Sequence, residues 1–213
     1  MFFRHHIRYY PTADAFLQKY DRPIQHLGKL PHWDLDGKLQ FVTFRLADSL
    51  PQSKLVEYKL AKNEWFQSHP YPHSEKELAE YTDLFGGKID EWLDAGMGEC
   101  LMKDAEVRNV VQEVIMHDDG VKYDIIAMCI MPNHVHLLLQ VYPKVELNKE
   151  LGDLKRISSH RINKLLCRTG DVWQHESFDR MIRSYAHFQR VVDYINHNGD
   201  KLSDSLYTVM LPE

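Results

Sequence analysis

Two apolar segments separated by a two-residue turn constrain the fold of this chain more than any other feature. The turn is Pro132-Asn133, and the segments are residues 123–131 (YDIIAMCIM) and 134–142 (HVHLLLQVY). Apolar segments on either side of a short turn predict a β-hairpin. Both segments are apolar enough to be central strands, so we expect an antiparallel sheet.

A further strand and several helices are predicted around this hairpin. Residues 39–46 (LQFVTFRL) have the composition of a strand. Ser74 and Glu77 have the spacing of a capping box, and Gly86-Gly87 is a weak point in the helix that follows. Strands that interleave with helices and include a hairpin are typical of the α+β class. The predicted helices cover residues 52–67, 74–95, 104–117, 147–166 and 179–197.

The length of 213 residues fits one domain with an elaboration. We expect an N-terminal arm of low regularity over residues 1–38 and a single domain over residues 39–202. A helical insertion is expected within that domain at about residues 52–117, and a C-terminal tail over residues 203–213.

Composition excludes several classes of protein. The net charge of −5 excludes a strongly basic nucleic-acid coat, and no apolar run approaches the ~18 residues of a membrane span. Three cysteines without a CxxC pair argue against a disulfide framework and fit a reducing cytoplasm.

Charge is also unevenly distributed along the chain. Residues 75–119 hold thirteen acids and four bases, whereas residues 154–190 hold eight bases and three acids. A basic C-terminal third could let an acidic protein bind a polyanion, although solvated helix faces explain the pattern equally well.

The strand that begins at His134 carries a candidate metal site. His134 and His136 lie two residues apart, so in a strand both imidazoles project from one face, about 6.6 Å apart at Cα. Tyr194 and Asn198 share a face of the last predicted helix, and an amide oxygen beside two imidazoles suits Mg²⁺ or Mn²⁺. As alternatives, the two histidines line a polar face of the sheet, Tyr194 anchors its helix by packing, and Asn198 caps that helix before Gly199.

Four blocks in order together resemble a known family, the REP-associated tyrosine transposases. These belong to the single-tyrosine HUH transposases and are close to the insertion-sequence transposases of that type. The resemblance covers about residues 30–200, and its blocks are MPNHVHLLL, LKRISSHRINKLL, WQHESFDRMIR and VVDYINHN.

The resemblance implies a ferredoxin-like sheet and a specific reaction. His134, His136 and Asn198 would be ligands of a divalent metal, and Tyr194 would be the nucleophile. The implied activity is cleavage and rejoining of single-stranded, hairpin-bearing DNA through a 5′-phosphotyrosine. We expect a bacterial, cytoplasmic protein near the nucleoid, with no membrane partner, acting as a monomer or a homodimer.

Alternatives remain for both the nucleophile and the function. Tyr185 with Gln189 forms a Y-x-x-x-Q motif that is a second candidate, and His197 could replace Asn198 as a ligand. Relatives usually follow the tyrosine helix with Asn-Pro, whereas Gly199 follows Asn198 here, which affects how that helix ends. The rival functions are a catalytically silent hairpin-binding protein and a phosphodiesterase that uses water.

Several basic residues and one tryptophan are candidates for contact with DNA. Basic side chains could follow the phosphate backbone, and a tryptophan could stack on a base. Alternatives are a packing role for Trp173, a helix-surface pair between Asp179 and Arg183, and a structural role for Arg45. The candidates are Arg45, Lys155, Arg156, Arg161, Lys164, Trp173, Arg180 and Arg183.

Overall fold

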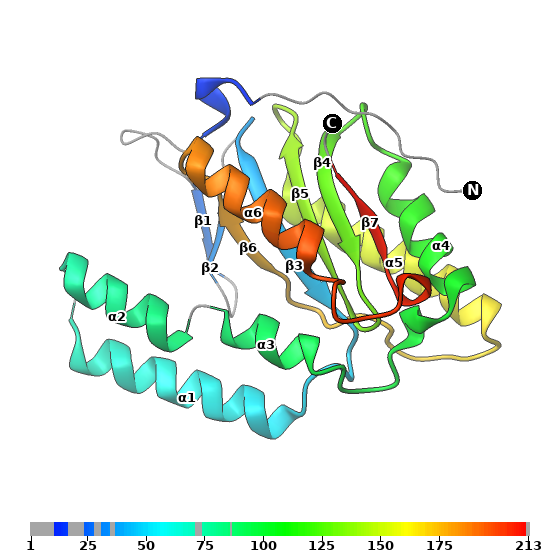
Figure 1. The fold of residues 1–213 in the computed structure, drawn as a ribbon, viewed down its shortest axis with the longest axis horizontal. Coiled ribbons are helices and arrows are strands. Elements are labelled where there is room, and N and C mark those ends of the chain that lie inside the picture. The colour runs from blue at the N-terminus through cyan, green and yellow to red at the C-terminus, as the bar shows by residue number, and fades with distance from the viewer. Residues whose placement is uncertain are drawn as a thin grey trace. The chain divides into compact units, whose positions relative to one another are not determined.

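The chain forms two compact units. A computed structural model describes residues 11–16, 24–27, 31–34, 37–70, 74–85 and 87–211. The sheet unit comprises Met1–Ala47 and Leu101–Glu213, and the helical unit comprises Asp48–Cys100 (Figure 1). Within the described residues, every helix is too short or too polar to span a membrane.

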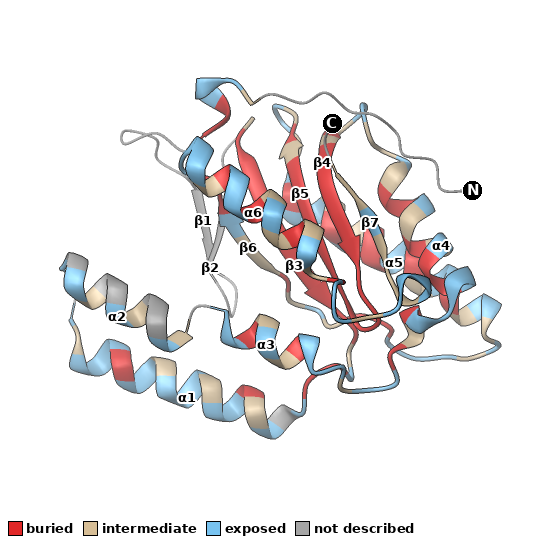
Figure 2. Ribbon diagram, viewed as in Figure 1, coloured by how far each residue is buried: buried red, intermediate tan, exposed pale blue. Residues whose placement is uncertain are grey.

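The sheet unit contains a five-stranded antiparallel sheet with the strand order β6-β3-β5-β4-β7. Its strands are β3 (Leu39–Arg45), β4 (Tyr123–Ile130), β5 (His134–Val141), β6 (Phe178–Met181) and β7 (Thr208–Met210). The hairpin predicted at Pro132-Asn133 is confirmed as β4 and β5, which are the most buried strands together with β3 (Figure 2).

Helices cover both faces of this sheet. The helices are α4 (Ala105–Met116), α5 (Leu147–Leu165) and α6 (Tyr185–His197). Phe188, Val191 and Ile195 of α6 pack on one face, while α4 and α5 pack on the other (Figure 1). Within the sheet unit, the elements β3, α4, β4, β5, α5 and β6 follow one another along the chain, and their strands lie in the sheet order β6-β3-β5-β4. This connectivity and strand order are the ferredoxin-like arrangement. The predicted α+β class and ferredoxin-like sheet are therefore confirmed.

The last predicted helix, residues 179–197, is wrong in its first part. Residues 178–181 form β6, which pairs with β3 at the sheet edge, and the helix begins only at Tyr185. Ser184 is the N-terminal cap of α6, because its hydroxyl accepts a hydrogen bond from the His187 amide at 3.2 Å. The proposed helix-surface pair between Asp179 and Arg183 is therefore wrong as well.

The N-terminal segment is more regular than expected. Strands β1 (Ile24–Leu27) and β2 (Pro31–Asp34) form a two-stranded antiparallel sheet, and a short 3-10 helix covers Ala13–Ala15. Lys38 donates hydrogen bonds to the carbonyl oxygens of Asp14 and Phe16, which attaches residues 11–16 to the sheet unit.

The helical unit contains α1 (Gln52–Ser68), α2 (Glu75–Phe85) and α3 (Lys88–Asp94). The capping box is confirmed, because the Ser74 amide donates to the Glu77 carboxylate at 2.6 Å and the Glu77 amide donates to Ser74 Oγ. Gly87 has a φ of 78° and separates α2 from α3. The insertion expected at about residues 52–117 also included α4, but α4 belongs to the sheet unit because its apolar face packs on the sheet.

Candidate active site

The two histidines of β5 lie side by side on the face of the sheet that α6 covers. Both side chains are completely buried, and their Nε2 atoms are 3.0 Å apart. Val135, between them, packs in the core on the opposite face. The alternation of a strand therefore places both imidazoles at one point, as the sequence predicts.

Each imidazole is held by a hydrogen bond at its other nitrogen. Asn133 Oδ1 lies 2.8 Å from His134 Nδ1, and Thr43 Oγ1 lies 2.8 Å from His136 Nδ1. An amide oxygen only accepts, so His134 Nδ1 carries the proton and its Nε2 presents a lone pair. A hydroxyl can donate or accept, so Thr43 can hold either neutral tautomer of His136.

The surroundings of these rings favour the neutral form. Burial lowers the pKa of His134 to about 3, and the nearby Asn198 side chain opposes this shift. Burial also holds the pKa of His136 well below its usual value, and the positive charge of Arg180 acts in the same direction. Neutral imidazoles are the form that binds metal ions.

Tyr194 lies next to this pair. Its phenolic oxygen is 3.2 Å from His136 Nε2, and its side chain is half-buried. Phe41 supports both rings: its ring stacks on His136 at a centroid distance of 5.4 Å and meets Tyr194 edge-on at 6.0 Å. The phenol is thus held beside the two histidines by packing from β3.

Asn198, which follows the last turn of α6, completes the cluster. Its Oδ1 atom is buried and has no hydrogen-bond partner among the described residues. A buried polar oxygen without a partner is unusual and points to a missing ligand. Two imidazoles and an unpaired amide oxygen fit a divalent cation that accepts nitrogen and oxygen donors. No group of three His, Cys, Asp or Glu residues that could hold a metal ion gathers in the described part of the chain.

The alternative residues for these roles lie elsewhere. The His197 Nδ1 atom is 2.7 Å from the carbonyl oxygen of Asp193, and its side chain is exposed. Tyr185 is 48% exposed and stacks on Phe188. It precedes Tyr194 by nine positions, which is about 13.5 Å along the helix axis. The structure therefore brings Tyr194, and not Tyr185, to the histidine pair.

The helix that carries Tyr194 ends against the C-terminal segment. A Cβ atom on Gly199 would lie 2.2 Å from a ring carbon of Tyr207. Glycine allows the Tyr207 ring to pack directly on the chain beside Asn198.

Three of the candidate DNA contacts are buried. Lys155 is 8% exposed, and its Nζ donates to the carbonyl oxygens of Gln174 and His175 and to Ser177 Oγ, at 2.7–3.0 Å. Burial lowers its pKa to about 8, as does the charge of Arg45, while Glu176 opposes the shift.

Trp173 and Arg45 are 6% and 3% exposed. The Trp173 indole N–H donates to Ser158 Oγ at 2.8 Å, and the ring packs edge-on against Phe44. The expected DNA contacts by Trp173, Lys155 and Arg45 therefore need correction, because all three side chains stabilise the interior. The packing role considered for Trp173 is the one observed.

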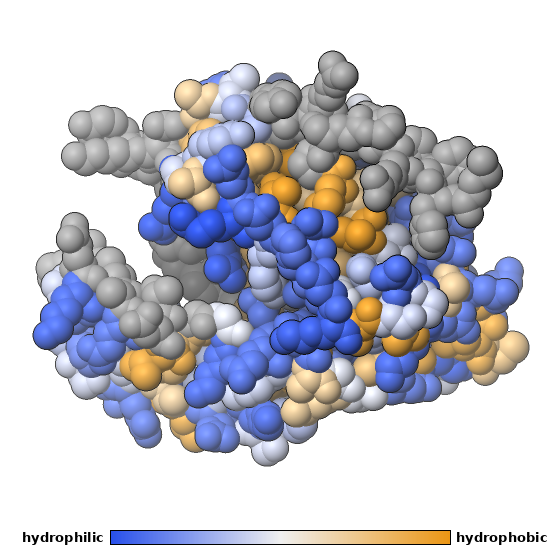
Figure 3. Space-filling model, in the orientation of Figure 1, coloured by the Kyte–Doolittle hydropathy of each residue, from blue (hydrophilic) through white to orange (hydrophobic). Residues whose placement is uncertain are grey.

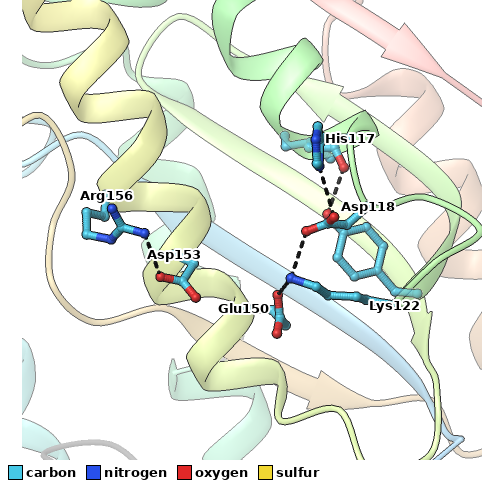
Figure 4. A network of polar contacts seen from close by, with 8 residues as sticks. His117, Asp118, Lys122, Glu150, Asp153 and Arg156 are labelled. Carbon is cyan, nitrogen blue, oxygen red and sulfur yellow. Dashed lines mark hydrogen bonds and ion pairs between the residues drawn. The ribbon is translucent and has the colours of Figure 1, made fainter.

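The other basic candidates on α5 lie on the opposite side of the sheet from Tyr194. Arg156 pairs with Asp153 at 3.0 Å, and Arg161 pairs with Glu113. They line a groove of about 310 Å³ whose charged residues form a network of alternating signs (Figure 4). Lys122, for example, lies between Asp118 and Glu150 at 3.0 and 2.7 Å. This groove is therefore not a concentrated cationic surface.

Sequence reasoning missed the residues that support the histidines. Phe41 and Thr43 carry no motif of their own, and their roles follow from the register of β3 with β5, in which Thr43 is directly opposite His136. Only the pairing of the two strands could have revealed them. Asn133 was recognised as a turn residue, but its hydrogen bond to His134 was not predicted.

Comparisons with known proteins agree with the resemblance found in the sequence. Residues 101–198 match a family model described as "Transposase IS200 like". A Haemophilus influenzae protein named for the REP-associated tyrosine transposases is 26% identical over 91 residues, which is 37% of this chain and 51% of that protein. The match thus spans about half the length of that relative. The predicted resemblance to this family is confirmed.

One solved structure is also similar to this chain. It is a REP-associated tyrosine transposase bound to a REP hairpin, 16% identical, with a TM-score of 0.42 over 87% of this chain and 74% of that one.

Proposed function

We propose that this chain cleaves and rejoins single-stranded DNA with Tyr194 as the nucleophile. The observation that carries the proposal is the convergence of one phenol, two buried neutral imidazoles and one unpaired amide oxygen in a single cluster. The match of residues 101–198 to a transposase family supports it. The substrate we propose is DNA that folds into REP-like hairpins, in keeping with the name of the bacterial relative.

The proposed reaction is a transesterification. The Tyr194 oxygen forms a bond to a backbone phosphorus and loses its proton, while the bond from phosphorus to the 3′-oxygen breaks and that oxygen gains a proton. The product is a 5′-phosphotyrosine, which retains a phosphodiester bond. A 3′-hydroxyl can therefore reverse the reaction without an external source of energy.

The chain's own residues orient the nucleophile and bind the cofactor. We propose that His134, His136 and Asn198 bind Mg²⁺ or Mn²⁺, which when bound polarises the phosphate and stabilises the leaving oxygen. Asn133 and Thr43 keep the two imidazoles oriented, and Phe41 fixes the ring planes.

One experiment tests this function. Hairpin-bearing single-stranded DNA is incubated with the protein and Mg²⁺ or Mn²⁺, and the products are separated on a denaturing gel. We expect a covalent protein–DNA species that is lost in Tyr194→Phe and retained in Tyr185→Phe. Cleavage without an adduct would indicate hydrolysis, and tight binding without cleavage would indicate a binding protein.

A second variant tests the metal ligands separately. His136→Ala should still bind DNA, because the residue is completely buried, but should lose metal-dependent cleavage. Undiminished cleavage by this variant would contradict the ligand assignment.

A further inference from the structure

A run of positive charge precedes the proposed nucleophile in both sequence and space. Residues 180–190 contain Arg180, Arg183 and Arg190 and no acidic residue. All three arginine side chains are exposed. They come from three successive parts of the chain: strand β6, its link to α6, and α6 itself.

The geometry of α6 aligns part of this run with Tyr194. His187, Arg190 and Tyr194 follow one another at intervals of three and four residues, so they share one flank of the helix. Tyr185 lies on a different flank by the same rule. The surface over α6 is hydrophilic along its length (Figure 3).

Arg180 reaches the same site from the sheet. It pairs with Phe41 in the register of β6 and β3, and its guanidinium lies 5.5 Å from the Phe41 ring centre. The Phe41 ring in turn stacks on His136. Arg180 is therefore on the face of the sheet that carries the two histidines.

The charges of the three arginines act on His187. Burial lowers the pKa of this imidazole, and Arg180, Arg190 and Arg183 lower it further. The Arg183 amide donates to His187 Nδ1 at 3.3 Å, which leaves the proton of the neutral ring on Nε2. His187 can thus donate a hydrogen bond in the middle of three cations.

Few acidic side chains lie near this group in the sequence. Asp179 faces the other side of the sheet, because its partner in β3 is Val42 and the strand alternates. Asp193 is the next acid along α6. Among the described residues, neither Arg183 nor Arg190 forms an ion pair. Exposed like charges gathered on one surface favour the binding of a polyanion.

We propose that Arg180, Arg183, His187 and Arg190 bind the backbone phosphates of single-stranded DNA next to the phosphate that Tyr194 attacks. This inference rests on the proposed function and adds the path of the strand: over β6 and along one flank of α6. The basic residues of α5, which are on the opposite side of the sheet, do not contact this strand.

Binding of an unstructured strand without cleavage tests the proposal. The probe is fluorescein-labelled oligothymidine in EDTA, and its Kd is measured by fluorescence anisotropy over a series of salt concentrations. The site variant is Arg180→Gln/Arg183→Gln/Arg190→Gln. The matched control is Arg156→Gln/Arg161→Gln/Lys164→Gln, which removes three positive charges from α5.

Each lost phosphate contact on a single strand lowers the slope of log K against log salt by about 0.7. We expect the site variant to lose about 2 units of slope and at least about tenfold in affinity. The control should change the slope by less than about 0.5. A triple Arg→Lys variant at the site, which keeps the charges, should retain the wild-type slope and shows that folding is intact.

Several results would overturn the proposal: equal effects of the two triple glutamine variants, an unchanged slope in the site variant, or no measurable binding by the wild type. These results are distinguishable from failure of the proposed function. If the wild type forms no covalent adduct but the slopes differ as expected, the phosphate site stands without the reaction.

Discussion

Replacing Thr43 by valine isolates the hydrogen bond that orients His136. Thr43 is 3% exposed, and its hydroxyl lies 2.8 Å from His136 Nδ1. Valine has nearly the same shape, so the substitution removes the hydroxyl and creates almost no cavity. A typical hydrogen bond contributes about 1 kcal/mol, and a buried nitrogen left without a partner costs about 1–3 kcal/mol. We expect the free energy of unfolding to fall by about 1–3 kcal/mol.

The same substitution should weaken metal binding. Loss of an orienting partner of a ligating histidine typically lowers metal affinity by about 10- to 100-fold. Urea denaturation in EDTA measures the stability, and calorimetric titration with Mn²⁺ measures the affinity. Thr43→Ser is the control, since it keeps the hydroxyl and should retain wild-type affinity. The reasoning is refuted if Thr43→Val binds Mn²⁺ as tightly as the wild type and is equally stable.

Three further substitutions test the packing of the sheet unit. Lys155→Met removes an amine whose pKa is about 8 in the folded state and near 10.5 in the unfolded state. Between pH 8 and 10.5 the unfolded wild type therefore binds more protons than the folded one, and its stability relative to this variant should rise by up to about 3 kcal/mol. Denaturation measured across that pH range shows no such rise if the amine is solvated. Gly199→Ala places a Cβ atom against the Tyr207 ring and should lower the free energy of unfolding by about 1–3 kcal/mol. An unchanged melting temperature would mean that the Tyr207 ring moves aside at no cost. Trp173→Phe removes the hydrogen bond to Ser158 and should lower the free energy of unfolding by about 1–2 kcal/mol. Its affinity for oligothymidine should stay unchanged. A loss of affinity in the folded variant would indicate that Trp173 contacts DNA after all.

Local patterns in the sequence predict much of the fold. The hairpin at Pro132-Asn133 and the capping box at Ser74 each depend on a few neighbouring residues, and both are present. Strand β6 was predicted as helix because its four residues give little periodic signal before a strongly helical segment. Its strand geometry comes from pairing with β3, which is distant in sequence.

The candidate site likewise has features that local spacing predicts and features that depend on contacts between distant parts of the chain. Alternation along β5 and helical spacing on α6 predict which side chains share a face, and the structure places Tyr194 beside His136. Burial of Lys155 and Trp173 could not be predicted, because helical spacing gives the direction of a side chain and not what packs on it. Thr43 needed the strand register, which one sequence does not provide.

The central claim is that Tyr194 becomes covalently attached to DNA. The most direct measurement is mass spectrometry of the peptides from protein incubated with hairpin-bearing DNA and Mn²⁺, followed by nuclease and protease digestion. We predict a phosphonucleotide on the peptide that contains Tyr194, at that residue. A phosphonucleotide on Tyr185, or cleaved DNA with every tyrosine unmodified, would contradict the account.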